Sequence, residues 1–120
     1  RPVVFDTQHY LEFRNGRQGI SHLLGLSRFD LAYQLERGWK ELHRCVREIH
    51  FCDCRPTLGN TRGRNFFPGE GDLPLEEFSE VVRSSGWQGR IVPEVYPRHL
   101  GRGKRNHAHL LAAVKEYFPV

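Results

Sequence analysis

Three short apolar runs, each rich in β-branched or aromatic residues, are separated by stretches in which apolar residues recur at helical spacing. The runs lie at residues 2–6, 46–52 and 90–95. Apolar runs of this length are typical of strands that are buried in a parallel sheet. The chain therefore alternates strand and helix three times. Because crossover connections are right-handed, this order predicts an α/β fold with parallel strands and outer helices.

The stretches between the runs predict the helices. Ser27 and Asp30 can form a capping box for a helix over residues 28–44, in which Gly38 is a weak point. Residues 10–26 contain three glycines among leucines, and this pattern predicts a loop with a turn of helix.

A long loop is expected between the second strand and the second helix. Residues 53–72 are rich in glycine and proline. Connections in compact domains are usually about 4–6 residues long, so we expect a loop of this length to be functional. Asp72 is expected to cap the helix that follows it, and a last helix is expected to begin near Asn106.

Each predicted strand ends in ionisable side chains: Asp6 in the first, His50 with Asp53 in the second, and Glu94 in the third. The carboxyl ends of parallel strands share one rim, so these side chains are expected to converge. Carboxylates and a neutral imidazole suit a divalent cation such as Mn²⁺, Mg²⁺, Co²⁺ or Zn²⁺. In the alternative interpretation, Asp6 caps a loop, His50 is a core residue and Glu94 forms a salt bridge.

The composition limits the classes of protein to consider. A chain of 120 residues, of which 38% are hydrophobic and 27% charged, fits a single domain. No apolar run approaches the roughly 20 residues that cross a bilayer, so no membrane partner is expected. The net charge of +4 fits phosphate-bearing ligands or nucleic acid, although a solvated basic surface explains it more often. Three cysteines make an odd count for a disulfide framework, so we expect reduced thiols and a cytoplasmic location.

Three further segments each have two interpretations. His43 and Cys45 with the Cys52-Asp53-Cys54 segment are either a structural zinc site or unrelated residues, since the paired spacing of zinc knuckles is missing. Residues 68–71 are either a phosphate cradle before a helix or a structural turn. Residues 101–105 either hold a sugar phosphate or form a solvated basic loop.

Four motifs follow one another along the chain: Asp6-Thr7-Gln8-His9, Ile49-His50-Phe51-Cys52-Asp53, Pro68-Gly69-Glu70-Gly71-Asp72 and Val92-Pro93-Glu94-Val95. They resemble the Asp-x-x-His, His-x-x-Asp/Glu and Gly-x-Gly segments and the final strand glutamate of the xylose isomerase-like TIM barrels. That family includes sugar-phosphate isomerases and epimerases and the endonuclease IV group. The resemblance covers nearly the whole chain, as strands six to eight of a (β/α)₈ barrel.

The resemblance implies a metal centre. Asp6, His50 and Glu94 match three of the four protein ligands of a single divalent metal ion, and the fourth, a glutamate that ends strand five, would precede Arg1. Glu94 is also the candidate for one half of a two-base proton transfer.

The implied activity is the isomerisation or epimerisation of a small sugar or sugar phosphate through an enediolate. The residues expected to contact this substrate are His9, Arg64 and Asp53, with Arg62 as the alternative to Arg64. Nucleic acid is not expected as a partner, and a homo-oligomer is compatible with the sequence.

Two other functions are considered. Endonuclease IV relatives bind a cluster of metals that needs an Asp-Arg-His segment, and Gly63-Arg64-Asn65 stands in its place here. This departure argues against cleavage of abasic DNA. The remaining alternative is a barrel without catalytic activity that serves as a binding module.

The length is small for the implied fold. A closed eight-stranded barrel takes about 250 residues, and three β-α units cannot close one. We therefore expect residues 1–120 to be a single partial domain, the C-terminal part of a larger barrel. Alone, these residues are expected to be poorly cooperative in folding and inactive, because strand edges and a metal ligand are missing.

Overall fold

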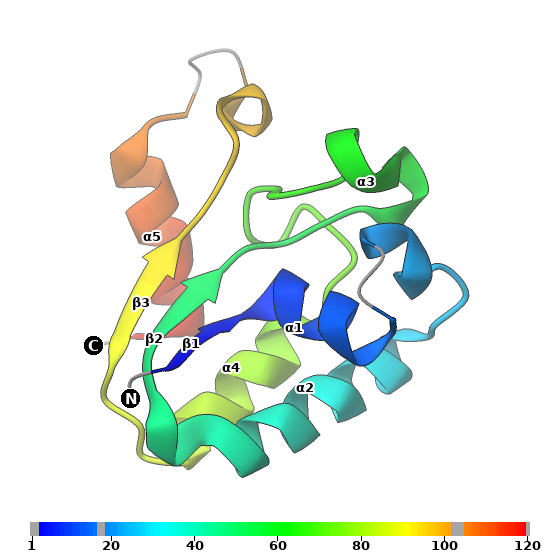
Figure 1. Ribbon diagram of the computed structural model, residues 1–120. Coiled ribbons are helices and arrows are strands. Elements are labelled where there is room, and N and C mark those ends of the chain that lie inside the picture. Colours follow the sequence, from blue (N-terminus) through cyan, green and yellow to red (C-terminus); the bar gives the residue numbers. More distant parts are fainter. Residues whose placement is uncertain (1–2, 17–18, 102–104, 120) are drawn as a thin grey trace.

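The strands form one parallel sheet in the order β1-β2-β3 (Figure 1). The computed structural model describes residues 3–16, 19–101 and 105–119. The strands are β1 (Val3–Asp6), β2 (Val46–Phe51) and β3 (Arg90–Pro93). The α/β architecture with parallel strands predicted from the alternating pattern is therefore confirmed. The expected first position of β1, residue 2, lies outside the described residues.

The helices lie between the strands and after the last one. The capping box of Ser27 and Asp30 is present, and the side chain of Asn106 caps the last helix through His109 N. No helix in the described ranges has the length and apolar character that a membrane crossing requires. The helices are α1 (Thr7–Arg14), α2 (Arg28–Leu42), α3 (Gly59–Arg62), α4 (Leu75–Ser84) and α5 (His107–Tyr117).

Two local predictions are wrong. The loop expected from residue 10 is helical as far as Arg14, because Asp6 caps α1 by accepting a hydrogen bond from His9 N at 2.8 Å. Asp72 does not cap α4, since Pro74 holds the N-cap position and no side chain bonds there. Asp6 thus caps a helix that was not expected, whereas the first turn of α4 has no side-chain cap.

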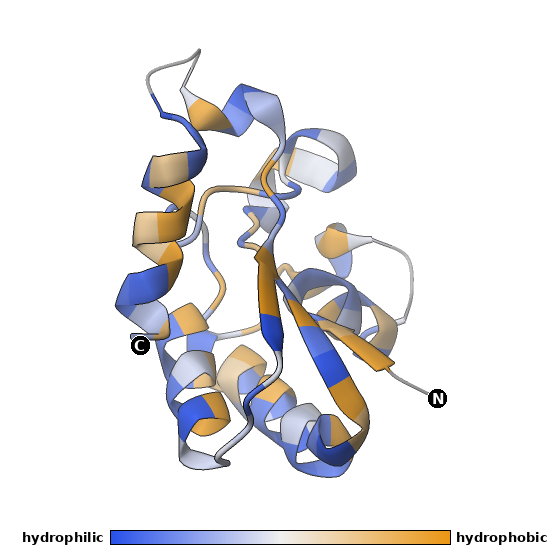
Figure 2. Ribbon diagram, turned by 90° about the vertical axis from the view of Figure 1, so that its left-hand side faces the viewer, coloured by the Kyte–Doolittle hydropathy of each residue, from blue (hydrophilic) through white to orange (hydrophobic). Residues whose placement is uncertain are grey.

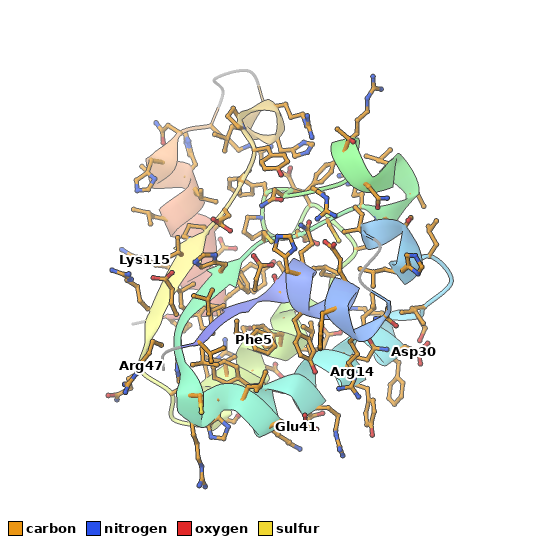
Figure 3. The ribbon with its side chains drawn as sticks, in the orientation of Figure 1. Phe5, Arg14, Asp30, Glu41, Arg47 and Lys115 are labelled. Carbon is orange, nitrogen blue, oxygen red and sulfur yellow. The ribbon has the colours of Figure 1, made fainter. Side chains whose placement is uncertain are left out.

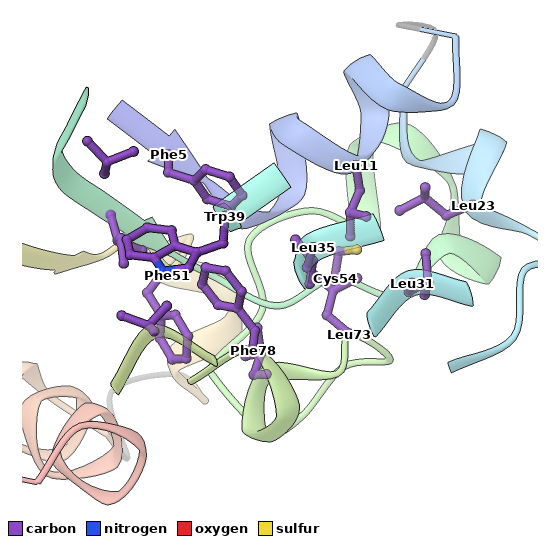
Figure 4. Close-up of a cluster of buried hydrophobic side chains, with 14 of the residues drawn as sticks. Phe5, Leu11, Leu23, Leu31, Leu35, Trp39, Phe51, Cys54, Leu73 and Phe78 are labelled. Atoms are coloured by element: carbon purple, nitrogen blue, oxygen red, sulfur yellow. The ribbon is translucent and has the colours of Figure 1, made fainter. Parts of the chain in front are cut away.

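The helices cover one face of the sheet. Side chains of β1 and β2 alternate between the two faces, and Phe5 and Phe51 point to the helices. The Phe5 ring lies 5.4 Å from Phe78 of α4 and 5.7 Å from Trp39 of α2, and Phe51 lies 5.2 Å from Tyr117 of α5. Figure 4 shows the rings of Phe5, Trp39, Phe51 and Phe78 within the apolar core.

The opposite face of the sheet carries polar side chains beside the valines Val4 and Val92, and no helix among the described elements covers it. Figure 2 shows the strands on one side of the molecule and α4 and α5 on the other. Figure 3 shows Phe5 beside β1 in the interior of the view, while the labelled Arg47 and Lys115 lie at the edge of the molecule. On the uncovered face, Val4 is 50% exposed. The functional side chains described below lie on this face, at its carboxyl rim.

The loop between β2 and α4 is organised by one buried acid. Asp53 is fully buried, and its carboxylate accepts hydrogen bonds of 2.9–3.0 Å from the N–H groups of Cys54, Gly69, Gly71 and Leu73. Burial raises the pKa of Asp53 to about 6, against the lowering effect of these N–H donors. The carboxylate thus holds together a segment that would otherwise leave buried donors unsatisfied.

Replacement of Asp53 by asparagine is expected to destabilise the protein by about 2–4 kcal/mol, because an amide group cannot accept at both positions and leaves buried N–H donors unpaired. Chemical denaturation measures the change. Asp72→Asn is the matched control, since Asp72 is exposed and does not cap α4. Equal stabilities of the two variants would contradict the role given to Asp53.

Helices α1 and α2 cross closely at Gly38. A Cβ atom at this position would lie 2.2 Å from the ring of Tyr10, which stacks on Phe5 at 4.8 Å and accepts a hydrogen bond from Arg14. The Tyr10 ring is therefore packed between Phe5 and Gly38. The glycine that weakens α2 as an isolated helix is required by the packing of α1 against it.

Gly38→Ala is expected to lower the stability by about 1–3 kcal/mol, although alanine would stabilise an exposed helix by about 1 kcal/mol. The clash is with one ring, so a double-mutant cycle with Tyr10→Ala tests it. In the Tyr10→Ala background, Gly38→Ala should be neutral or stabilising. An equal loss in both backgrounds would show that the Tyr10 ring is not the obstacle.

Candidate metal centre

Three ligand-type side chains meet at the carboxyl rim of the sheet. The strand register places Asp6 beside His50, and Glu94 N bonds to Phe51 O just beyond β3. His50 Nδ1 lies 3.1 Å from Glu94 Oε1 and 4.0 Å from Asp6 Oδ2. In the part of the chain that the structure describes, this is the group of three whose ligand atoms lie within 4.8 Å of one another. The structure thus brings together the three residues expected to converge.

A third acid, which the sequence analysis missed, contacts the other side of the imidazole. Glu48 Oε2 lies 2.6 Å from His50 Nε2. Its second oxygen, Oε1, accepts hydrogen bonds from Arg90 Nε at 2.9 Å and Nη2 at 2.6 Å. The signal in the sequence is the spacing, since residues two apart on a strand share a face.

The surrounding charges shift the pKa values of the group. Burial raises the pKa of Asp6, against the N–H of His9, which lowers it. Burial alone would lower the pKa of His50, but three facing carboxylates outweigh it, so the pKa is raised. Those carboxylates belong to Glu48, Glu94 and Asp6. The centre is therefore rich in negative charge, as a cation site requires.

The donor set fits a divalent cation. Two carboxylates and one imidazole are the ligands that Mn²⁺, Mg²⁺, Co²⁺ and Zn²⁺ accept, and no thiolate is needed. The side chains of Asp6 and His50 are 12% and 24% exposed, and Glu94 is 43% exposed, so the group is open to solvent on one side. Ligation of a metal by these residues stays a prediction.

Comparison with known families agrees with this geometry. The family model described as xylose isomerase-like TIM barrel matches residues 2–117. The chain belongs to this family. The family includes sugar isomerases and epimerases as well as endonuclease IV. Searches among curated proteins and among solved structures give no match. The α/β sheet with parallel strands is consistent with part of such a barrel.

In this xylose isomerase-like chain, His9 lies beside the three-residue group. Its side chain is 65% exposed and, together with Glu94 and Asn65, lines a pocket of about 560 Å³. His9 is thus placed to meet a molecule bound next to Glu94.

The two other residues expected to contact substrate are engaged inside the protein. Arg64 forms a bidentate ion pair with Glu12 of α1, with N···O distances of 2.5 and 2.9 Å. Asp53 is fully buried beneath the loop, so the geometry gives it a structural role in place of the expected substrate contact. Arg62, the alternative to Arg64, is exposed at the end of α3.

A hydrogen-bonded network under the rim was also missed by the sequence analysis. Asn65 has a positive φ of 53° and donates its backbone N–H to Gln8 Oε1 at 3.1 Å. Its side chain donates to the carbonyl oxygen of Glu94 at 3.2 Å. Asn65 therefore connects α1 to the segment after β3 and fixes the position of Glu94.

The cysteines and the basic loop do not form further sites in the described residues. Cys45, Cys52 and Cys54 are free, and burial raises the pKa of Cys52, which keeps it as a thiol, a poor metal ligand. The zinc-site interpretation is therefore not supported. Residues 102–104 of the basic segment lie outside the described residues.

Removal of the imidazole tests the centre directly. In the product of the complete reading frame, His50→Ala is expected to weaken Co²⁺ binding by more than about 100-fold. Loss of a residue that only orients a ligand typically weakens metal binding by about 10–100-fold, and loss of the ligand itself costs more. Titration followed by visible absorption measures the affinity. His22→Ala, outside the group, should bind Co²⁺ like the parent, and equal affinities for all three proteins would refute the site.

Proposed function

We propose that this chain forms the catalytic rim of a divalent-metal-dependent sugar or sugar-phosphate isomerase or epimerase. The observation that carries the proposal is the convergence of Asp6, His50 and Glu94 at the carboxyl ends of parallel strands, next to an open pocket. Active sites of such barrels lie at this end of the strands. Membership of a family that includes sugar isomerases and epimerases supports the same conclusion.

The proposed reaction moves a proton at a carbon atom next to a carbonyl group. A bound divalent cation would polarise the substrate oxygens and stabilise the enediolate that forms. Glu94 takes the proton from this carbon, because its carboxylate both faces His50 and lines the pocket. Asn65 keeps Glu94 in place through the backbone carbonyl. A second base on the opposite face of the substrate completes the transfer.

Polar groups around the pocket would orient the sugar. His9 is exposed beside Glu94 and can bond a substrate hydroxyl. Arg64 is a further candidate for contact with substrate oxygens, with its guanidinium paired to Glu12 and its side chain 19% exposed. The pair with Glu12 would then hold the guanidinium in a fixed orientation.

We further propose that residues 1–120 supply strands six to eight of the family's barrel, as a partial domain. Three strands cannot close a barrel, and in the described residues β1 and β3 are each paired on one edge only. The fourth ligand and the second base would come from a neighbouring strand beside β1.

The geometry favours the isomerase over a nuclease. A trinuclear site would need ligands from residues 63–65, but Arg64 pairs with Glu12 and Asn65 is bonded to Gln8. The described residues hold one group of three ligand-type side chains, which suits a single ion.

Glu94→Gln is expected to lower turnover by about 10²–10⁴-fold, because the amide group cannot accept the proton. The assay uses the product of the complete reading frame, loaded with Mn²⁺ or Co²⁺, and a panel of aldoses, ketoses and their phosphates in D₂O. Incorporation of deuterium at the carbon next to the carbonyl reports the proton transfer.

Glu116→Gln, on α5 and outside the site, is the control and should keep full activity. The role of Glu94 is contradicted if its glutamine variant, loaded with metal, exchanges deuterium at the rate of the parent. Cleavage of abasic DNA with more than one metal ion per chain would instead support the nuclease.

A further inference from the structure

On the uncovered face of the sheet, hydrogen bonds link Arg90 to Glu48 and Glu48 to His50 of the candidate metal centre. Glu48 pairs in register with Arg90 of β3, one layer below His50. Its carboxylate bonds to Arg90 through Oε1 and to His50 Nε2 through Oε2. Both oxygens of Glu48 are thus used, one for each neighbour.

The two nitrogens of His50 face different partners. Nε2 faces Glu48 Oε2 at 2.6 Å, whereas Nδ1 faces Glu94 Oε1 at 3.1 Å and Asp6 Oδ2 at 4.0 Å. A neutral imidazole carries one proton, so the carboxylates on its two sides compete for it. The shorter contact is with Glu48, and an ionised carboxylate can only accept a hydrogen bond.

This competition decides whether His50 can act as a ligand. When Glu48 holds the proton on Nε2, the lone pair of Nδ1 is directed towards Asp6 and Glu94. Without Glu48, the carboxylate of Glu94 would draw the proton to Nδ1 and block the nitrogen that faces the other ligands. Histidine ligands in proteins commonly donate their second N–H to a carboxylate in this way.

Arg90 holds Glu48 in this orientation. Its guanidinium contacts Glu48 Oε1 through two nitrogens, which leaves Oε2 for the imidazole. The side chain of Glu48 is 19% exposed, whereas that of Arg90 is 79% exposed. Arg90 is thus the more exposed partner of the pair, so its removal should have a smaller effect than removal of the Glu48 carboxylate.

We propose that Glu48, held by Arg90, is a positioning residue that keeps the proton of His50 on Nε2 and so presents Nδ1 to a divalent cation. The inference rests on the proposed metal centre for its functional meaning. The orientation of the imidazole is a property of this chain that can be measured without metal.

Two measurements on the product of the complete reading frame test the proposal. Titration with Co²⁺ gives the affinity, and ¹⁵N-resolved NMR of the imidazoles in metal-free protein, at a pH where His50 is neutral, shows which nitrogen carries the proton. The variants are Glu48→Ala, Glu48→Gln and Arg90→Gln. Arg47→Gln is the matched control, since Arg47 is an exposed arginine next to Glu48 on β2.

Glu48→Ala is expected to weaken Co²⁺ binding by about 10–100-fold and to move the His50 proton from Nε2 to Nδ1. Glu48→Gln should fall between parent and alanine variant, because its amide oxygen can still accept. Arg90→Gln should weaken binding by a few fold, and Arg47→Gln should change neither measurement. Glu48→Gln keeps the test valid if the alanine variant does not fold.

The outcomes separate this inference from the proposed function. If His50→Ala abolishes binding while both Glu48 variants bind like the parent and keep the proton on Nε2, Glu48 has no positioning role. If the parent binds no metal, the proposed metal centre fails, yet a proton on Nε2 that moves in Glu48→Ala would still establish how Glu48 orients the ring. A proton on Nδ1 of the parent would overturn the inference.

Discussion

The parallel pairing of the three strands is the constraint on which the rest of the structure depends. It fixes Asp6 beside His50 and places Glu94 just past the end of β3. It also divides the side chains between a face packed on aromatic rings and a face left to polar groups. A shift of one strand by one residue would exchange the two faces and remove both the core and the site.

On the uncovered face, several carboxylates lie close together near one imidazole and repel one another. Their repulsion is reduced by donors that belong to the fold: Arg90 for Glu48, and the first turn of α1 for Asp6. A cation at the centre would reduce it further. The charge of the site is thus balanced partly by side chains and partly by backbone N–H groups.

Local patterns in the sequence predict the strands, the capping box of α2 and the convergence of the rim residues, because each depends on neighbours in sequence or on the rule that parallel strands share a rim. The role of Asp53 could not be predicted, since three of its four partners lie 16–20 residues away and meet it only when the loop closes. Helix α1 was not predicted, because a capping role of Asp6 was considered only for a loop. Glu48 was within reach, as its spacing from His50 follows the strand period, but its partner Arg90 comes from another strand.

The carboxylate of Asp6 serves two structures at once. One oxygen, Oδ1, caps α1 through His9 N, and the other, Oδ2, faces His50. The first turn of α1 and the rim of the sheet are therefore joined through a single side chain. This helix also carries Glu12, which holds Arg64. Binding at the rim would therefore be coupled, through Asp6, to the first turn of α1 and to His9, which lines the pocket.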